Sequence, residues 1–594
     1  MPMSKRISYM LCGWTIATGA IYGASTAKAG VPNVHEPQLP AIVEQFTADS
    51  RSLARAYSVE ISPARIAQFL KLYGDTEAEL SAIDFDALSQ EDKIDYLSLR
   101  NRLSADLHQL EIRKKQIAEM QPLLPFAKTI EDLMEGRRLM QRPAAEKDAA
   151  ALSAMVKDIK ATRDRLDPKP HGTSPGESAQ RPKIDPVVAN RAVLATNELV
   201  SDLHDWFNQY NGYDPEFTWW IDQPYKDADK ELAGYKDFLK EKLIGIKPDD
   251  KTTIIGDPVG RDALLGDLAD NLIPYTPEEL IAIAQTEYDW CMGEMLKASR
   301  EMGFGDNWHA AVEKVKGMHV PPGEQPELIR KLVVEGSDFA KNNQLVTVPP
   351  LADETWRMIM MTPERQLVNP FFTGGNEISV SYPTDTMTYD QREMSMRGNN
   401  IPFARATAFH EMIPGHFLQF YMGARYHPYR HAFETPFWIE GNALWWEMLF
   451  WDKGFDRTPE ERVGALVWRM HRSARIVFTM NFHLGRWTPQ QCVQYLMDSV
   501  GFDSDNATAE VRRSFDGSVG PLYQSAYLLG ALQFRAMHHE LVDSKKMTDR
   551  EFHDAILHEN SMPVELVRAD LENQRLTRDF KTSWKFYGDH PTHP

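Results

Sequence analysis

The amino-acid sequence predicts a mainly α-helical protein with a small β element near residues 345–385. Apolar residues recur at three- and four-residue spacing over long stretches, which is the period of one face of an α-helix. Charged residues fill the positions between them, as on amphipathic helices that pack against each other. Only two short stretches, 346–350 and 377–383, resemble strands, and the second alternates apolar and polar residues.

The first half of the chain is predicted to be a helical lobe, from about residue 45 to residue 345. The stretch 168–187 is dense in turn residues, so we expect a loop or linker there, with helical patterning resuming from 187 to 243. Residues 276–279, Thr-Pro-Glu-Glu, are typical of a helix start, with threonine as N-cap and glutamate at the third position. The periodic apolar positions before the linker include Ile66, Leu70, Tyr73, Leu99, Leu103, Leu107 and Leu110.

The N-terminus has the three parts of a secretory signal peptide. Lys5 and Arg6 precede a mostly apolar run, residues 7–24, and the small-x-small sequence 27–29 follows it. We expect cleavage after Ala29, which leaves residues 30–594 in the periplasm or outside the cell; the alternative is an uncleaved membrane anchor. No later segment is long and apolar enough to cross a bilayer, so we expect no stable membrane span after cleavage.

Composition narrows the classes of partner. The formal net charge is -19, from 85 acidic and 66 basic residues, which argues against nucleic acid because phosphate binding needs a basic surface.

After cleavage two cysteines remain, Cys291 and Cys492. They either pair with each other or are two free, buried thiols.

A histidine-rich motif in the second half indicates metal chemistry. His410 and His416 enclose Glu411, and in zinc hydrolases two such histidines bind the metal while the glutamate handles the proton of a metal-activated water. Side chains six residues apart on a regular helix diverge by about 120°. Pro414 cannot donate to the carbonyl of His410, and Gly415 tolerates irregular dihedral angles. The sequence therefore predicts a helix break that returns His416 to the face of His410; the alternative is that the helix ends here and His416 binds nothing.

Glu440 is the predicted third ligand. It follows His416 by 24 residues and lies among aromatic residues, where an unpaired carboxylate is costly to bury. Two histidines and one glutamate leave a fourth position open for water, as in catalytic zinc sites. Glu447, two turns later, is either a partner of a ligating histidine or a surface charge, and we favour the surface charge.

These motifs resemble those of the bacterial DUF885 family, which is similar to helical zinc metallopeptidases of the gluzincin type. The first, His-Glu-x-x-Pro-Gly-His, spans 410–416, with Phe417 where the family usually has another histidine. The second, Glu-Gly-Trp-Ala-Leu-Tyr-x-Glu in the family, spans 440–447, with Asn442 and Trp445 departing. Further matches follow in order: Arg475 to His483, with Thr479 and Asn481 departing, then Trp487-Thr488, Pro521, Tyr527 and Gly530, and Phe552 to Pro563.

The resemblance implies a large two-lobed helical body with a deep cleft, in which residues 346–594 form the catalytic lobe. It implies one zinc ion per chain, with Glu411 as the general base. Tyr527, with Tyr523 as its substitute, would stabilise an oxyanion, or would be a buried tyrosine bonded to a backbone carbonyl. His483 would be a further donor near the site. The implied zinc ligands are His410, His416 and Glu440.

We therefore expect an exported zinc-dependent peptidase that hydrolyses short peptides. A metal-dependent hydrolase of non-peptide esters or amides is one alternative, because the same water activation would serve it. The other is a periplasmic peptide-binding protein without turnover, for which the departures at Asn442 and Thr479 leave room.

Overall fold

The computed structural model describes residues 38–588 except 168–183, 248–249, 251–252 and 367–370. Helices dominate the described residues and only two short strands occur among them, which confirms the mainly α fold. Each of these helices is too short or too polar to span a bilayer. The expected signal peptide and nearly all of the expected linker at 168–187 lie outside the described residues.

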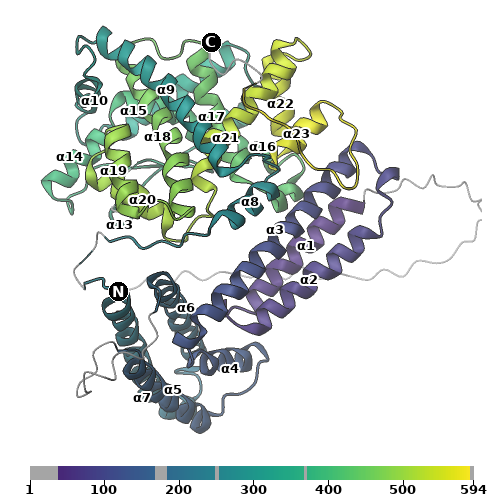
Figure 1. The fold of residues 1–594 in the computed structure, drawn as a ribbon, viewed down its shortest axis with the longest axis vertical. Coiled ribbons are helices and arrows are strands. Elements are labelled where there is room, and N and C mark those ends of the chain that lie inside the picture. The colour runs from purple at the N-terminus through teal and green to yellow at the C-terminus, as the bar shows by residue number, and fades with distance from the viewer. Residues whose placement is uncertain (1–37, 168–183, 248–249, 251–252, 367–370, 589–594) are drawn as a thin grey trace, which may run out of the picture. The chain divides into compact units, whose positions relative to one another are not determined.

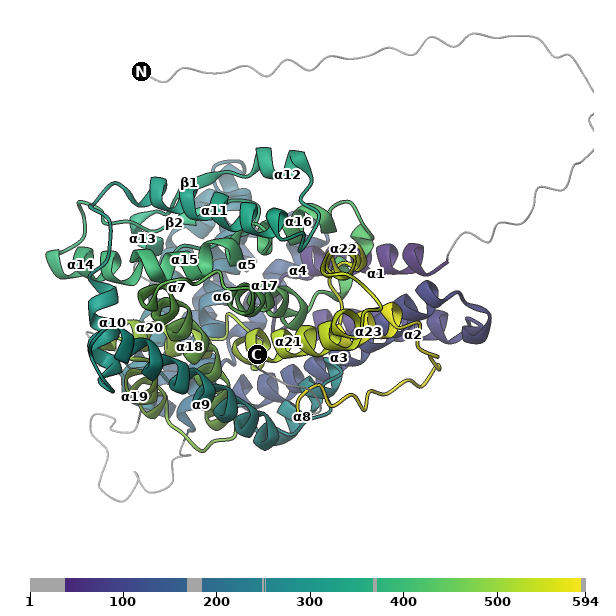
Figure 2. The ribbon, with the colours of Figure 1, turned by 90° about the horizontal axis from the view of Figure 1, so that it is seen from above.

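Long helices make up the first half of the chain. Helices α1, α2 and α3 lie side by side (Figures 1 and 2), with Phe46 of α1 against Tyr73 of α2. The expected start of α9 is confirmed, because Thr276 and Glu279 form a capping box. The bounds are α1 (Gln38–Ala56), α2 (Pro63–Ser81), α3 (Gln90–Met120), α4 (Ala127–Arg138), α5 (Ala145–Leu166), α6 (Pro186–Tyr210), α7 (Pro215–Phe238), α8 (Arg261–Asp270), α9 (Pro277–Glu301), α10 (Trp308–Lys316) and α11 (Gln325–Asn342).

Helix α18 is the central element of the second half. It packs against α9, α15, α19 and α21, and every residue from 466 to 483 is buried. Burial on this scale includes polar side chains, and two of them, Arg472 and Arg475, pair with Glu447 and Glu510 beside the site described below. The bounds are α12 (Pro350–Thr355), α13 (Pro363–Gln366), α14 (Tyr389–Gly398), α15 (Ile401–Glu411), α16 (His416–Gly423), α17 (Pro436–Asp452), α18 (Pro459–His483), α19 (Pro489–Val500), α20 (Ser504–Phe515), α21 (Tyr523–His538), α22 (Asp549–Glu559) and α23 (Val564–Leu571).

The β element is a parallel pair of three-residue strands, β1 (Met358–Met360) and β2 (Ile378–Val380), with Met358 opposite Ile378. The predicted strand at 377–383 contains β2. The predicted strand at 346–350 is wrong, because Pro349 and Pro350 begin α12 instead. Proline has no N–H to donate to a ladder but fits the first turn of a helix.

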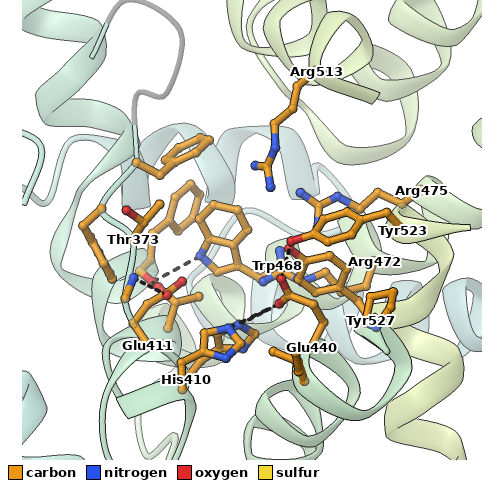
Figure 3. A pocket seen from close by; sticks show the side chains of 18 of the residues that line it. Thr373, His410, Glu411, Glu440, Trp468, Arg472, Arg475, Arg513, Tyr523 and Tyr527 are labelled. Atoms are coloured by element: carbon orange, nitrogen blue, oxygen red, sulfur yellow. Dashed lines mark hydrogen bonds and ion pairs between the residues drawn. The ribbon is translucent and has the colours of Figure 1, made fainter. Parts of the chain in front are cut away.

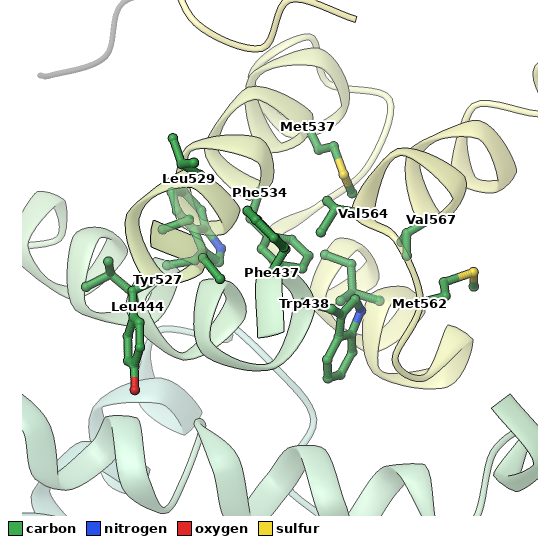
Figure 4. Packing of buried hydrophobic residues seen from close by; sticks show 14 of the residues in the cluster. Phe437, Trp438, Leu444, Tyr527, Leu529, Phe534, Met537, Met562, Val564 and Val567 are labelled. Carbon is green, nitrogen blue, oxygen red and sulfur yellow. The ribbon is translucent and has the colours of Figure 1, made fainter. Parts of the chain in front are cut away.

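Helices α17 and α21 approach each other closely at two glycines. A Cβ added at Gly441 would lie 2.5 Å from the Cα of Gly530, and one added at Gly530 would lie 2.0 Å from the carbonyl oxygen of Phe437. The apolar side chains around this contact, among them Phe437 and Phe534, fill the space beside it (Figure 4). The contact fixes the position of α17 relative to α21, and both helices carry residues of the site described below.

Three apolar clusters form the core of the described residues. One combines α4 to α7, and a second surrounds α18 and contains both Cys291 and Cys492. These two cysteines are free and buried, and burial raises the pKa of each thiol to about 12. The largest cluster includes residues on both sides of position 345, from Leu39 to Phe586.

Candidate metal centre

The break between α15 and α16 brings two histidines together. Helix α15 ends at Glu411 and α16 begins at His416, with Met412 and Gly415 in non-helical conformations between them. The break that the sequence predicts is therefore present. The two imidazole rings of His410 and His416 are perpendicular, with centroids 4.9 Å apart.

Gly415 makes this break possible. A Cβ at this position would lie 1.8 Å from the carbonyl oxygen of His410 and 2.7 Å from that of Phe409. Its N–H donates to the carbonyl oxygen of Phe409 at 3.0 Å, so the chain folds back onto the last turn of α15. Only a residue without a side chain fits against the backbone here.

Helix α17 supplies a carboxylate to the two imidazoles. The Oε2 atom of Glu440 lies 3.3 Å from Nε2 of His416 and 3.7 Å from Nε2 of His410. All three side chains are buried. The structure thus brings together the three residues that the sequence proposes as ligands.

The separations of Glu440 Oε2 from the two histidine nitrogens fit a zinc ion. Ligands about 2.0–2.2 Å from a tetrahedral zinc lie about 3.3–3.6 Å from one another, close to the separations of Glu440 Oε2 from the two histidine nitrogens. Among the described residues, Oε2 of Glu440 is buried and accepts no hydrogen bond. A buried carboxylate oxygen without a donor is costly, and a cation at this point would remove the cost.

Side chains behind the histidines orient their Nε2 atoms. Nδ1 of His410 lies 2.7 Å from Oε1 of Glu447, whose side chain is only 9% exposed, so our preference for Glu447 as a surface charge is wrong. Nδ1 of His416 donates to Oε1 of Gln419 at 3.2 Å, and Nε2 of Gln419 donates to Oδ1 of Asn442 at 2.9 Å. Asn442, which departs from the family motif, therefore holds the glutamine that orients His416. Both contacts direct the remaining ring nitrogens toward Glu440.

Without an ion, the charges of the cluster are strongly coupled. Burial lowers the pKa of His410, but contacts with Glu440 and Glu447 outweigh this effect and raise that pKa to about 9. Burial raises the pKa of Glu440, but His416 and His410 together hold this pKa well below its usual range. The carboxylate of Glu440 is thus ionised, and an imidazole beside it carries a proton. A metal ion would have to displace this proton to bind the imidazole nitrogen.

Glu411 lies beside the cluster on the same cavity. Its Oε2 atom accepts a hydrogen bond from the backbone N–H of Gly374. A Cβ at Gly374 would lie 2.2 Å from the carbonyl oxygen of Glu411, so glycine is needed for this approach. The contact fixes the carboxylate at the end of α15.

A cavity of about 530 Å³ opens onto these residues (Figure 3). This volume lies in the range of small-molecule and short-peptide sites. Its apolar wall includes Phe403, Phe420 and Trp468. Its ionisable lining residues are His410, Glu411, His416, Glu434, Glu440, Arg472, Arg475, Arg513, Tyr523 and Tyr527.

Two tyrosines of α21 lie next to Glu440. The hydroxyl of Tyr523 donates to Oε1 of Glu440 at 2.5 Å, and the ring of Tyr527 stacks parallel to that of His410 with centroids 6.4 Å apart. Burial raises the pKa of Tyr527 to about 12, and burial and the neighbouring Glu440 raise the pKa of Tyr523 as well. Both phenols are therefore neutral near pH 7 and able to donate.

His483 does not line the cavity, contrary to the expectation from the sequence. It is the last residue of α18, eight residues or about 12 Å beyond Arg475 along the helix axis. Its ring contacts Phe482 and Phe515, and burial among such groups lowers the pKa of His483 to about 4. The sequence predicts none of the three arginines at the site, although Arg475 begins one of the family motifs and Arg472 lies three residues before it on the same helix.

The fold and the site define a mainly α-helical protein with a buried His-His-Glu cluster beside a cavity. Residues 51–571 match the model of the DUF885 family, described as "Bacterial protein of unknown function", and the chain belongs to this family. No curated protein matches the chain.

Two solved structures share the fold. One, from Shewanella oneidensis, is described as "a putative lipoprotein of unknown function"; it has 17% sequence identity and a TM-score of 0.65, over 90% of this chain and 99% of that one. The other, described as a "putative lipoprotein" from Colwellia psychrerythraea, has 14% identity and a TM-score of 0.55, over 90% of this chain and 98% of that one.

Proposed function

We propose that this protein is an exported zinc-dependent peptidase that hydrolyses short peptides, with one zinc ion per chain. The observation that carries the proposal is the convergence of His410, His416 and Glu440 beside Glu411 on one cavity. The Nε2 atoms of the two histidines and Oε2 of Glu440 would hold the ion. When bound, zinc would polarise a carbonyl group and activate water for attack.

Glu411 is the general base in this proposal. Its Oε2 atom accepts the N–H of Gly374, which leaves Oε1 to take the proton of the attacking water and pass it to the leaving amine. Tyr527, with a pKa of about 12, keeps its proton near pH 7 and can donate a hydrogen bond to a developing oxyanion. Tyr523 already donates to Glu440 and supports the ligand instead.

The size of the cavity supports short peptides as the substrate class, because about 530 Å³ accommodates a few residues and not a folded protein. The sequence of residues 1–29 supports export. The motif at 410–416 resembles that of gluzincin metallopeptidases, and this resemblance agrees with the proposed chemistry.

Metal analysis combined with a peptide-library digest tests the proposal. We expect about one equivalent of zinc per chain in the purified protein, and cleavage of short peptides that stops on chelation and returns with zinc. A purified protein without about one equivalent of transition metal would contradict both the peptidase and the non-peptide hydrolase. Metal without peptide cleavage, together with turnover of simple esters or amides, favours the non-peptide hydrolase.

A further inference from the structure

The wall of the cavity that faces the His-His-Glu cluster carries three arginines. Arg472 and Arg475 come from α18, and Arg513 comes from α20. Three cations on one wall of a site for a neutral peptide bond have no role in the chemistry proposed above. Two of the three are paired with carboxylates of the protein, and the third is not.

Arg472 and Arg475 have partners within the protein. A guanidinium nitrogen of Arg472 lies 3.5 Å from Oε1 of Glu447, and Nε of Arg475 donates to Oε1 of Glu510 at 2.7 Å. Both arginines also lie over the ring of Tyr527. These contacts tie the two arginines to acidic side chains of the protein and to Tyr527.

Arg513 differs from them. Among the described residues it has no hydrogen bond and no ion pair, although it is only partly exposed. Figure 3 shows its guanidinium group reaching from α20 toward the cavity, opposite His410. A guanidinium offers five donors in a planar fork that matches a carboxylate in two-point contact.

The charges around the cavity leave Arg513 in excess. With zinc bound, its two positive charges balance Glu440 and Glu411, and the pairs of Arg472 with Glu447 and Arg475 with Glu510 each sum to zero. Glu434, the other acid on the wall, is exposed and lies 2.7 Å from Nδ1 of His431. When this exposed pair is set aside, one positive charge remains among the groups of the cavity, on the side chain that reaches into the space for substrate.

We propose that Arg513 binds a carboxylate of the substrate, so that the peptidase prefers peptides with an anionic group a short distance from the scissile bond. This inference rests on the proposed function for its substrate class. The carboxylate is either the C-terminal one, which makes the enzyme a carboxypeptidase, or an aspartate or glutamate side chain. A charge-assisted contact with a carboxylate strengthens binding about 10- to 100-fold.

Binding measurements test this proposal separately from hydrolysis. Protein carrying Glu411→Gln is titrated calorimetrically with tetra-alanine as the free acid, with the same peptide as the C-terminal amide, and with the amide of Ala-Ala-Glu-Ala. We expect the free acid or the glutamate peptide to bind at least tenfold more tightly than the uncharged amide. The peptide that gains identifies the source of the carboxylate.

Variants assign the preference to one residue. In Arg513→Gln the preference is expected to fall below twofold, and in Arg513→Lys, which keeps the charge without the fork, to an intermediate value. Arg512→Gln removes a neighbouring charge of α20 that does not line the cavity and should keep the full preference. Circular dichroism establishes that each variant folds.

The outcomes separate this inference from the proposed function. A preference that is unchanged in Arg513→Gln, equal binding of the acid and the amide, or no binding of any probe at millimolar concentration overturns the role of Arg513. A carboxylate preference that depends on Arg513 in a protein that cleaves no peptide upholds that role while the peptidase proposal fails.

Discussion

The Nδ1 atom of His410 lies 2.7 Å from Oε1 of Glu447, two turns along α17 from Glu440. Helix α17 therefore supplies both a proposed ligand and the carboxylate that supports another proposed ligand. A carboxylate at Nδ1 fixes the ring orientation, keeps the proton on Nδ1 and makes Nε2 a better donor to a metal. The contact also gives a partner to a second acid that lies beside the cluster with only 9% of its side chain exposed.

Glu447→Gln is expected to weaken zinc binding about 10- to 100-fold while the protein stays folded, because it removes the charge that supports His410. Chelator competition measures the zinc affinity. Glu354→Gln, which changes an exposed carboxylate on α12, is the control and should keep the affinity of the parent. Equal affinities of the parent and Glu447→Gln would show that the contact does not support a ligand.

Gly415→Ala is expected to abolish stoichiometric zinc binding and to lower the melting temperature. An added Cβ would overlap the carbonyl oxygen of His410, so the turn must open and His416 moves away from His410. Gly234→Ala, at a helical glycine with free space around it, is the control and should be neutral or slightly stabilising. A Gly415→Ala protein with full zinc content and parental melting temperature would contradict this account of the helix break.

Local patterns were sufficient to predict the helices and the break at 412–415. The period of apolar residues, the capping box at Thr276 and the Pro414-Gly415 pair each determine structure within one or two turns. The wrong prediction of a strand at 346–350 also has a local cause, because two consecutive prolines there begin a helix despite the apolar residues before them. The actual partner of β2, Met358–Met360, has no alternation to reveal it.

The surroundings of the ligands depend on contacts between distant segments, which spacing does not reveal. Spacing predicts a surface position for Glu447, whereas His410 of α15 and Arg472 of α18 enclose its carboxylate in the folded protein. Arg513 lies about 100 residues beyond His410 and reaches the cavity only through the placement of α20. His483 shares a helix with Arg475 and a motif with it, yet the length of the helix carries it away from the site.

The two tyrosines of α21 are expected to differ in their effects. Tyr527→Phe should lower kcat about 10²- to 10³-fold with zinc content unchanged, because it removes a donor to the oxyanion. Tyr523→Phe should weaken zinc binding, because its hydroxyl donates to Oε1 of Glu440. Steady-state kinetics and zinc titration on both variants measure the two effects. The reverse pattern, with Tyr523→Phe losing kcat alone, would exchange the two roles.

His483 is expected to make the protein sensitive to acid. Its pKa in the folded protein is about 4, below the value of 6.5 for an ordinary histidine, so the unfolded chain binds the additional proton between these values. The stabilisation is complete above pH 6.5 and is lost as the pH falls toward 4. Between pH 7.5 and pH 5 the parent should lose about 2 kcal/mol of unfolding free energy through this residue.

The variant His483→Leu isolates that effect. Leucine keeps an apolar side chain against Phe482 and Phe515 and carries no titrating group. Urea unfolding at pH 7.5 and pH 5 should show a smaller acid-induced loss in the variant, by about 2 kcal/mol. The same loss in both proteins would mean that His483 is protonated in the folded state.

Glu411→Gln is expected to lower kcat about 10²- to 10⁴-fold while zinc content, fold and peptide binding stay at parental levels. The amide keeps the size of the side chain and an oxygen that can accept the N–H of Gly374, but it cannot take a proton from water. Turnover of a library-derived peptide and metal analysis of the same preparation provide the measurement, with Glu354→Gln as the control. Parental kcat in Glu411→Gln would remove Glu411 as the base, whereas loss of zinc would mean that its carboxylate helps to hold the ion.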